Sequence, residues 1–557
     1  MRRIYISAVV ALLVSLFSGT NVRAQVLDFG GTVLNNDIAS WSDLYDLSHT
    51  THSYGTARSM AMGNAFTALG ADMVSASLNP AGVGMYLSDD MSFTPMINVA
   101  KSDSSGQALY IANDGAKSSS TNFIVPNFGV VLPVYKGVGI FTNINFALSY
   151  NRIADFNQSR LMASMGHNYE SSLANYFRLF SDAFLDDPTC DKVDQLEYDD
   201  PFLWGATLAN RTDLTNYKEG VWSNDTIYDG VVVDQYSWLE TLGAVDEWSF
   251  AGGFNIIDKL YFGISIGLQS INYTRNTYYG EDYSYAVGDT GNENQLLDTK
   301  YWQSTYYYGS GYNFKFGVTA RPVHWLRIGV ANHTPTYYSL EIGYAGAMQT
   351  ETSHIEPGSS TEDIIPNYQE SPYFEEYGMN AWQYHTPSRL LTGVSVTLGN
   401  RAILSADYER SWYQGMRLTN CSTIRGLEEL YNGYFSDLFK ANNTLRLGVE
   451  CYVLPNIALR AGYIWSDSAI KSAYERAMTS RPSPTTQSFI TAGLGFHLNK
   501  STYLDLAYQY GTTYYTSIQP FYVTETYDDQ TVAYIDSAIF DTKTTQQRFV
   551  LTLGFRF

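Results

Sequence analysis

The stretch Gly263-Ile264-Ser265-Ile266-Gly267 matches the G-x-S-x-G pattern of serine hydrolases. That chemistry needs the serine on a sharp strand-to-helix turn, with a histidine and an acid placed beside it. Here Ser265 lies in a smoothly alternating segment, both glycines fall on its face, and no helical pattern follows. We therefore predict no catalytic residue and no enzyme activity. The alternative that the motif leaves open is an enzyme, namely a phospholipase built on a β-barrel.

Other residues could in principle hold a metal or a haem. His49 and His52 form an H-x-x-H pair, but no further Cys, His or acid stands at ligand spacing. The run Asp289-Thr290-Gly291-Asn292-Glu293-Asn294 lacks the full spacing of an EF-hand loop. We expect no metal site and no cofactor. Acidic pairs at Asp186-Asp187 and Asp199-Asp200 are read as solvated, although they could bind divalent cations that bridge lipopolysaccharide.

The N-terminus has the layout of a cleaved secretory signal. Arg2 and Arg3 precede an apolar stretch from Ile4 to Phe17, and Val22-Arg23-Ala24 gives a small-residue boundary. We predict a signal peptide over residues 1–24 and a mature chain that begins at Gln25. Beyond residue 24 no apolar run approaches the ~18 residues that a transmembrane helix requires.

The composition suits a β-barrel in an outer membrane. The chain has 46 Tyr, 44 Gly and only 16% charged residues, which fits aromatic girdles, tight turns and close strand contacts. Its net charge of −21 argues against a nucleic-acid partner. Its three cysteines provide no disulfide framework; a bond between Cys190 and Cys421 stays open, and Cys451 is expected on the lipid face.

Period-two alternation is clearest in the last ten residues. Phe549, Leu551, Leu553, Phe555 and Phe557 fall on one face, and the opposite face is polar or small except for Val550. The terminal Phe557 resembles the signature that bacterial barrels present to their assembly machinery. We predict fourteen strands near 91–99, 122–133, 138–150, 246–256, 260–275, 304–320, 325–339, 386–398, 402–412, 443–453, 457–466, 487–498, 502–511 and 546–557.

The connections between these strands alternate strictly in length. Short turns lie near residues 135–137, 257–259, 321–324, 399–401, 454–456 and 499–501. Long polar segments cover 100–121, 151–245, 276–303, 340–385, 413–442, 467–486 and 512–545. Short periplasmic turns opposite long external loops are typical of bacterial barrels, whereas a soluble sandwich has no reason to sort its loops this way. The fold class predicted is a transmembrane antiparallel β-barrel.

Three motifs resemble the FadL/TodX family of outer-membrane transporters for hydrophobic compounds. The first is the Gly-Ala-rich stretch 55–70, followed by Asp72 and by Leu78-Asn79-Pro80-Ala81-Gly82. The second runs from Gly311 to Gly317 and on through Arg321-Pro322 and 325–329 to His333-Thr334-Pro335-Thr336. The third is Thr386-Pro387-Ser388-Arg389, on a strand that leads to Asp407-Tyr408-Glu409.

The resemblance implies a fourteen-stranded barrel with a small N-terminal hatch in its lumen. We expect a signal peptide at 1–24, an N-terminal extension at 25–54, a hatch at 55–90 and the barrel at 91–557. Asn79, Pro80 and Ala81 are the gating residues carried over from the family's hatch tripeptide, because Asn79-Pro80 favours a fixed turn. The extension is a departure from the family pattern, so ligand-binding residues stay unknown. Lumen charges at Arg327, Arg446, Glu450 and Arg460 are interpreted as structural pairs that hold the hatch to the wall.

The function expected from the resemblance is passive uptake of hydrophobic small molecules, such as long-chain fatty acids or aromatic hydrocarbons. The partners expected are that ligand, outer-membrane lipid and lipopolysaccharide, and the barrel assembly machinery, with the chain as a monomer. Barrels with a similar Asn-Pro-Ala-Gly hatch also dock cargo in the type IX secretion system, which is the alternative. A haem receptor is a third hypothesis, and it rests only on His49 and His52.

Overall fold

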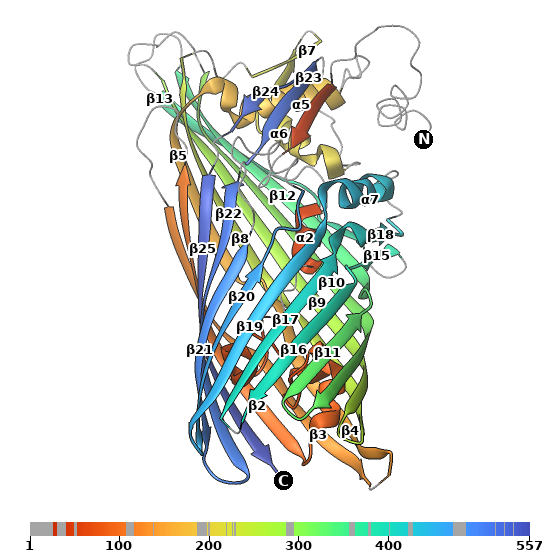
Figure 1. The fold of residues 1–557 in the computed structure, drawn as a ribbon. Coiled ribbons are helices and arrows are strands. Elements are labelled where there is room, and N and C mark those ends of the chain that lie inside the picture. Colours follow the sequence, from red (N-terminus) through yellow and green to blue (C-terminus); the bar gives the residue numbers. More distant parts are fainter. Residues whose placement is uncertain are drawn as a thin grey trace.

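The structure is a computed structural model of the whole chain, drawn in Figure 1. It describes residues 26–30, 41–48, 53–106, 116–137, 139–185, 198, 201–218, 220–224, 227, 230–285, 294–355, 362–376, 380–399, 401–421, 427–471, 486–518, 520–527, 530–537 and 540–557. The signal peptide, His49, His52, the acidic pairs, the run 289–293 and Cys190 lie outside these residues. The predictions about them stay predictions.

The wall is a closed antiparallel barrel of 14 strands, so the predicted fold class is confirmed. It closes where the first wall strand pairs with the last, with Asp90 opposite Arg556. Closure leaves no unpaired strand edge. In spatial order the wall strands are β2 (Asp90–Gly106), β3 (Ala116–Lys136), β4 (Phe141–Asp155), β8 (Val232–Ile256), β9 (Leu260–Ser284), β10 (Asn294–Val323), β11 (Leu326–His333), β16 (Arg389–Leu398), β17 (Ala402–Trp412), β19 (Ala441–Leu454), β20 (Ile457–Ser466), β21 (Gln487–His497), β22 (Thr502–Ile518) and β25 (Phe540–Arg556).

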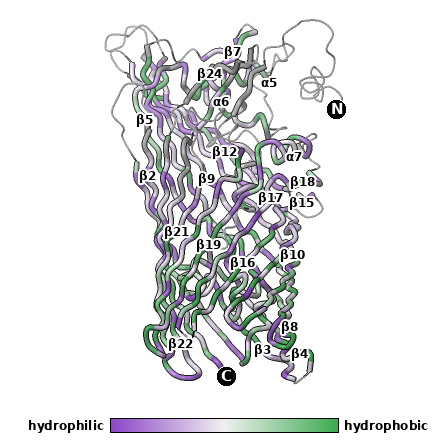
Figure 2. Tube along the Cα trace, in the orientation of Figure 1, coloured by the Kyte–Doolittle hydropathy of each residue, from purple (hydrophilic) through white to green (hydrophobic). Residues whose placement is uncertain are grey.

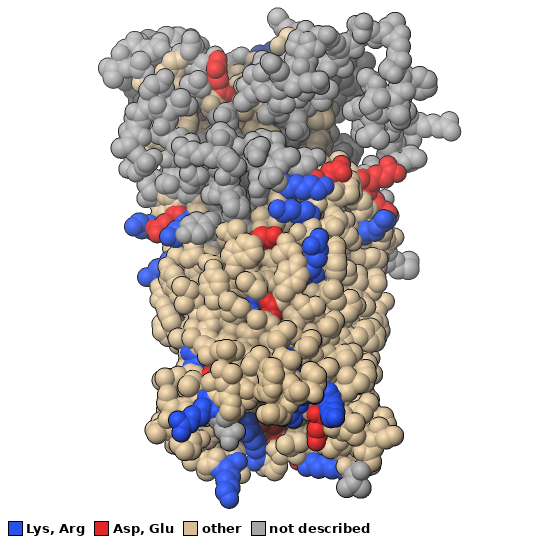
Figure 3. Space-filling view, viewed as in Figure 1, with Lys and Arg blue, Asp and Glu red and all other residues tan. Residues whose placement is uncertain are grey.

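The wall strands alternate as predicted between an apolar outer face and a lumen face. In β9, Phe262, Ile264, Ile266 and Leu268 are exposed, whereas Ser265 is buried. This alternation can be followed in Figure 2, and Figure 3 shows charged side chains gathering toward the two ends of the wall, with a mostly uncharged surface between them. An apolar outer band is the surface that lipid requires.

The short turns lie where they were predicted, at the end that carries the C-terminus in Figure 1, but the strands run longer at the other end. The strand predicted over 246–256 is Val232–Ile256, and the one predicted over 304–320 is Asn294–Val323. The added residues lack the apolar-polar alternation that lipid imposes on the membrane part, which is why the pattern did not reveal them. They still pair continuously, for example from Ser304 opposite Asn276 to Lys300 opposite Gly280.

Prolines alter two of the predicted strands, one by dividing it and one by delaying its start. The strand predicted over 325–339 divides into β11 and β12 (Tyr337–Ile355) around Pro335. The strand predicted over 386–398 begins only at Arg389, and Pro387 separates it from the short strand β15 (Trp382–His385). Proline cannot donate to a strand ladder. The backbone N–H of Thr336 instead donates to the Thr386 side chain at 2.9 Å, so the two interruptions are joined to each other.

The upper ends of the strands carry a cap, in which Figure 1 shows α5 (Leu173–Phe184), α6 (Trp204–Arg211), β7 (Val221–Ser223), β23 (Tyr522–Tyr527) and β24 (Gln530–Asp536). One hydrophobic cluster of the cap joins α5, α6, β23 and β24 to the upper parts of β8, β9 and β10. Further elements outside the wall are β1 (Val26–Gly30), β5 (Gln158–Asn168), η2 (Tyr169–Ser171), η4 (Pro201–Leu203), β6 (Asn216–Lys218), β13 (Glu362–Glu370), β14 (Phe374–Glu376), η6 (Tyr413–Gly415), β18 (Arg417–Thr419) and α7 (Leu427–Leu438).

Many tyrosines are buried inside the molecule, in addition to those expected in the aromatic girdles at the membrane interfaces. The largest fully buried side chains include nine tyrosines: Tyr176, Tyr273, Tyr279, Tyr301, Tyr307, Tyr338, Tyr384, Tyr413 and Tyr431. They fill the upper lumen and the cap, where a phenol provides apolar area and a hydroxyl that needs a partner. None of the described helices is long and apolar enough to cross a membrane. Cys421 and Cys451 are free thiols, and Cys451 shares the outward face of β19 with Leu447.

Candidate functional site inside the barrel

Residues 55–89, which we call the hatch, form a compact unit inside the wall. The unit contains α3 (Ala57–Ala61), α4 (Ser75–Leu78) and the 3-10 helix η1 (Pro80–Met85). Almost every side chain from Gly55 to Tyr86 is buried. Gly63 and Gly70 have φ values of +60° and +65°, which permit the tight turns that keep the unit small. Helix α3 contacts β20, β21, β22 and β25, whereas η1 contacts β4, β8, β9 and β10, so the hatch contacts wall strands from two sides.

Asn79 joins two parts of the hatch and one wall strand. Its side-chain amide donates to the Thr67 carbonyl at 2.5 Å and to the Thr319 hydroxyl of β10 at 3.2 Å. Its side-chain oxygen accepts from the Ala81 N–H at 3.1 Å, which caps η1. Pro80 occupies the first position of η1, where a missing N–H costs nothing. The geometry thus gives the tripeptide a definite structural position, and its gating role stays a prediction.

Glycines in the wall make room for this tripeptide. A Cβ atom added at Gly263 would overlap the Pro80 carbonyl group, and one added at Gly317 would overlap the Asn79 side chain. Gly263 is the first glycine of the G-x-S-x-G pattern, so close packing of the hatch accounts for it. Ser265 pairs with Ala251 on one side and Lys315 on the other. Because β9 continues regularly through this position, the strand-to-helix turn of a hydrolase is absent from it.

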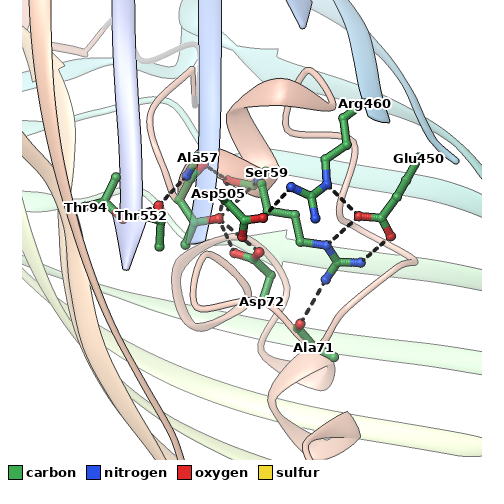
Figure 4. A network of polar contacts seen from close by, with 11 residues as sticks. Ala57, Ser59, Ala71, Asp72, Thr94, Glu450, Arg460, Asp505 and Thr552 are labelled. Carbon is green, nitrogen blue, oxygen red and sulfur yellow. Dashed lines mark hydrogen bonds and ion pairs between the residues drawn. The ribbon is translucent and has the colours of Figure 1, made fainter. Parts of the chain in front are cut away.

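Arg58 of the hatch and three wall residues form an ionic network. Figure 4 shows its wall members Glu450, Arg460 and Asp505. Arg58 of α3 donates to both oxygens of Glu450, at 3.0 and 2.9 Å. Arg460 donates to Glu450 at 2.6 Å and to Asp505 at 2.5 Å. Removing one partner of a buried ion pair typically costs about 3–5 kcal/mol, because the other charge is left uncompensated. The network therefore attaches α3 firmly to β19, β20 and β22.

The sequence interpretation of the lumen charges holds for pairing in three of the four residues and for attachment of the hatch in one. Glu450 holds the hatch directly through Arg58. Arg460 pairs with Glu450 and Asp505 of the wall, and Arg446 pairs with Glu409 of the wall at 2.6 Å. Arg327 forms no ion pair with any described residue. Arg58 itself lies in the Gly-Ala stretch and was not singled out from the sequence. The signal that could have found it is a lone arginine in an otherwise small and apolar segment.

Polar wall side chains bind the hatch backbone at many further points. Gln509 donates to the Met60 carbonyl, Thr491 to Ala61 and Asn145 to Val83, at 2.9, 2.7 and 2.8 Å. These bonds satisfy buried backbone groups that the short hatch helices leave unpaired. Within the hatch, burial raises the pKa of Asp72, although the Arg58 charge and hydrogen bonds from Val74 and Thr56 act in the opposite direction.

A second inserted element, helix α2 (Trp41–Ser48), lies in the upper lumen (Figure 1). Its Leu44 and Leu47 are buried in one hydrophobic cluster with residues of β9, β10 and β12. The Tyr45 ring stacks on Phe439 at 5.0 Å between centroids. The sequence analysis treated this region only as an extension of uncertain role. The helical spacing of Trp41, Leu44 and Tyr45 is the signal that could have indicated an inserted helix.

Beside α3, Pro95 interrupts the pairing of β2 with both neighbours, because proline cannot donate to a strand ladder. The register with β3 shifts between Thr94 and Met96, and the pairing with β25 skips Thr94 and Pro95 without a change of register. A groove of about 850 Å³ follows the wall there, lined by apolar residues such as Phe123, Leu506 and Phe549.

The floor of this groove includes the Met96, Ala507 and Val550 side chains. These three belong to one hydrophobic cluster with Ala57, Met60 and Ala61 of the hatch. A single layer of wall side chains thus separates the groove from the hatch. This contact also explains why Val550 departs from the polar lumen face of β25.

Comparison with known proteins returned structures with this architecture. The toluene transporter TodX of P. putida is 11% identical, with a TM-score of 0.46, over 90% of this chain and 97% of its own. A FadL homologue of Pseudomonas aeruginosa is 12% identical, with a TM-score of 0.46, over 94% and 99% of the two chains. The toluene transporter TbuX of Ralstonia pickettii is 14% identical, with a TM-score of 0.44, over 91% and 99%. No family model and no curated protein matches the sequence.

These structures come from the same group of transporters that the hatch and hairpin motifs resemble. With TM-scores below 0.5, the substrates of those proteins are not carried over to this chain. Its own architecture places it in a membrane. A closed antiparallel barrel with an apolar outer band and short turns at one end is the design of outer-membrane proteins.

Proposed function

We propose that this protein lets hydrophobic small molecules cross the outer membrane passively, and that the hatch controls their passage. The observation that carries the proposal is that the lumen is filled by inserted segments, whereas the wall closes independently of them. The hatch is bound only by hydrogen bonds, ion pairs and packing. Such contacts can be exchanged while the wall ladder stays intact.

The lining of the upper lumen supports an apolar passenger. The cluster around α2 contains aromatic and aliphatic side chains from several wall strands, among them Ile271, Leu340 and Ile342. Sites for apolar ligands are lined in this way, with few polar groups that fix orientation. The groove beside Pro95 would provide an exit toward lipid if the hatch moved, because Met96 and Val550 separate the two. We also propose that the partners of the chain are the barrel assembly machinery and lipopolysaccharide, and that the chain is a monomer.

The test replaces Asn79-Pro80-Ala81 with three glycines. Loss of Pro80 frees its own backbone and that of Asn79, and loss of the Asn79 amide breaks the bonds to Thr67 and Thr319. We expect altered uptake of a neutral hydrophobic probe at wild-type amounts of folded, heat-modifiable barrel. Leakage of small polar antibiotics is expected to increase as well. Unchanged uptake together with unchanged leakage would contradict the gating proposal.

A docking barrel for exported cargo is the second candidate, and the cap favours it. The cap has a hydrophobic core of its own, and β1 near the N-terminus pairs with β23 from the far end of the chain. A large folded surface of this kind suits a protein partner better than a small passenger. If the triple-glycine variant lost cargo secretion while its hydrophobic uptake stayed intact, the docking function would be preferred. The haem hypothesis gains no support, because its two histidines lie outside the described residues.

A further inference from the structure

A row of aromatic side chains crosses the outer face of the wall near its upper end. It comprises Tyr236 of β8, Tyr278 of β9, Trp302 of β10 and Tyr368 of β13, and successive ring centroids lie 5.8, 5.3 and 6.2 Å apart. Along β9 the neighbours of Tyr278 are buried on the inner side of the wall, so the row faces outward. The rings on β8, β9 and β10 are half-buried, whereas Tyr368 is 50% exposed. We call these four residues the aromatic row.

The aromatic row lies well above the part of the wall that faces lipid. Leu268 is the last apolar side chain on the outer face of β9 before Tyr278, which follows ten residues later. At the usual rise and tilt of a barrel strand, this separation corresponds to about 25 Å of height. The outward positions between the two are polar: Ser270, Asn272, Thr274 and Asn276. The girdle of a membrane interface adjoins the apolar band directly, so the aromatic row is not part of that girdle.

Hydrogen-bonding groups border the aromatic row on both sides. Above it, four acids on adjacent strands stand in register: Asp234, Asp282, Asp298 and Glu351. Lys300, beside them, forms ion pairs with Asp298 at 2.7 Å and with Glu351 at 3.8 Å. Below the row, the Asn276 side chain donates to Glu240 at 3.2 Å and accepts from Ser304 at 2.8 Å. Like charges opposite one another destabilise a sheet, so the stability of the wall does not account for the acids.

This combination of side chains fits a sugar chain. One face of a pyranose ring presents C–H groups, which pack on the face of an aromatic ring, and the edge of the pyranose presents hydroxyls. Those hydroxyls donate to carboxylate and amide oxygens, which accept more than one hydrogen bond each. The aromatic row extends from β8 across β9, β10 and β12 to β13, about 19 Å at the usual strand spacing. It can therefore contact several successive sugar residues.

We propose that the aromatic row binds uncharged sugar residues of the glycan that stands on the membrane beside the barrel, the polysaccharide of lipopolysaccharide. The row faces sideways from the wall, which is the direction from which a chain anchored in the surrounding membrane approaches. The acids above the row repel an anionic sugar. The inference rests on lipopolysaccharide as a partner, proposed above, and adds to it the surface of this chain and the part of the glycan that meet.

The test measures binding of three lipid-free saccharides to the full-length protein in nanodiscs that contain no lipopolysaccharide. They are dextran, hexagalacturonate and the polysaccharide that mild acid releases from the lipopolysaccharide of the native host. The wild-type protein is expected to bind the released polysaccharide, to bind hexagalacturonate much more weakly, and to keep the polysaccharide in excess dextran. Trp302→Ala removes a central ring and is expected to weaken binding about tenfold, the upper range for one aromatic contact. Trp302→Phe keeps a ring and is expected to retain most of the binding.

Trp465→Ala serves as the matched control, because Trp465 is an outward tryptophan of β20, on another part of the wall, and is 38% exposed. It is expected to bind the polysaccharide like wild type. The inference is overturned if the wild type does not bind the polysaccharide, or if Trp302→Ala binds it as tightly as Trp465→Ala. Displacement by dextran would assign the row to dissolved glucans, and equal binding of hexagalacturonate would contradict selection for uncharged sugars.

Uptake of naphthalene by proteoliposomes separates this inference from the proposed transport. Trp302→Ala is expected to take up naphthalene like wild type, because the aromatic row lies outside the lumen. If naphthalene enters while the polysaccharide does not bind, only the inference fails. If the polysaccharide binds through the row while naphthalene does not enter the wild type, only the proposed transport fails.

Discussion

At the scale of single residues, glycines on the inner face of the wall leave room for the hatch. Gly252 and Gly253 are neighbours on β8 and show the effect side by side. A Cβ at Gly253 would overlap the backbone at Val83 and Gly84 of η1, whereas a Cβ at Gly252 meets only side-chain atoms at 3.9 Å or more. Part of the abundant glycine in the sequence therefore lies on the lumen face of the strands, where the hatch leaves no space for a side chain.

This pair of glycines gives a matched prediction. Gly253→Val is expected to weaken hatch docking by about 1–3 kcal/mol, the usual cost of overpacking, and to accelerate amide exchange over residues 81–85. Gly252→Val points outward and should leave that exchange at the wild-type rate. The measurement is hydrogen exchange of both variants in nanodiscs. Equal exchange in the two variants would show that close packing at Gly253 does not hold η1.

Sequence reasoning was most successful here where a residue type is rare in its surroundings. Asn79-Pro80 and the lumen charges stand out in a strand-rich, weakly charged chain, and the structure gives Asn79, Glu450 and Arg460 specific partners. The ion pair between Asp43 of α2 and Arg275 of β9, whose charged atoms lie 3.0 Å apart, could not be predicted in the same way. The two residues are far apart in sequence, and neither belongs to a motif. Only the path of α2 into the lumen brings them together.

At the scale of elements, the period-two pattern identified the wall because lipid imposes it. It failed above the membrane, where β8, β9 and β10 continue as polar, Tyr-rich strands. It also missed the break at Pro335 within the predicted strand 325–339, and it placed the start of the strand 386–398 before Pro387 and not after it. The pattern reports what a strand faces and not whether its hydrogen-bond ladder is continuous.

The terminal strand gives the prediction at this scale. Phe557 ends the outward row of β25 and is 75% exposed, while Leu87, before β2, is 72% exposed. Phe557→Asp is expected to reduce the amount of heat-modifiable barrel in the outer membrane severalfold, because it removes the apolar row's last member and the terminal signature. Leu87→Asp removes a similar exposed apolar surface and should have a much smaller effect. Equal barrel levels in the two variants would mean that the terminal residue carries no special assembly signal.

At the scale of the whole molecule, the N-terminal part of the chain runs through the barrel from one end to the other. Strand β1 pairs with β23 in the cap, α2 lies in the upper lumen, and the hatch lies below it, next to the start of β2 (Figure 1). Among the residues that the structure describes, no backbone hydrogen bond joins α2 or η1 to the wall, and their contacts are made by side chains and packing. A segment held in this way can move as a unit while the barrel stays closed.

The measurement that tests the central claim most directly is uptake with the hatch fixed to the wall. In a background with Cys190, Cys421 and Cys451 replaced by Ser, Asn79→Cys and Thr319→Cys place a disulfide between hatch and β10, at side chains now 3.2 Å apart. The control pair, Thr56→Cys and Ser59→Cys, joins two hatch residues whose hydroxyls are also 3.2 Å apart. Uptake of a neutral hydrophobic probe into proteoliposomes is compared before and after reduction. We predict that oxidation stops uptake through the first variant, that reduction restores it, and that the control is indifferent to both. Equal uptake by the oxidised and reduced forms of the first variant would contradict control by the hatch.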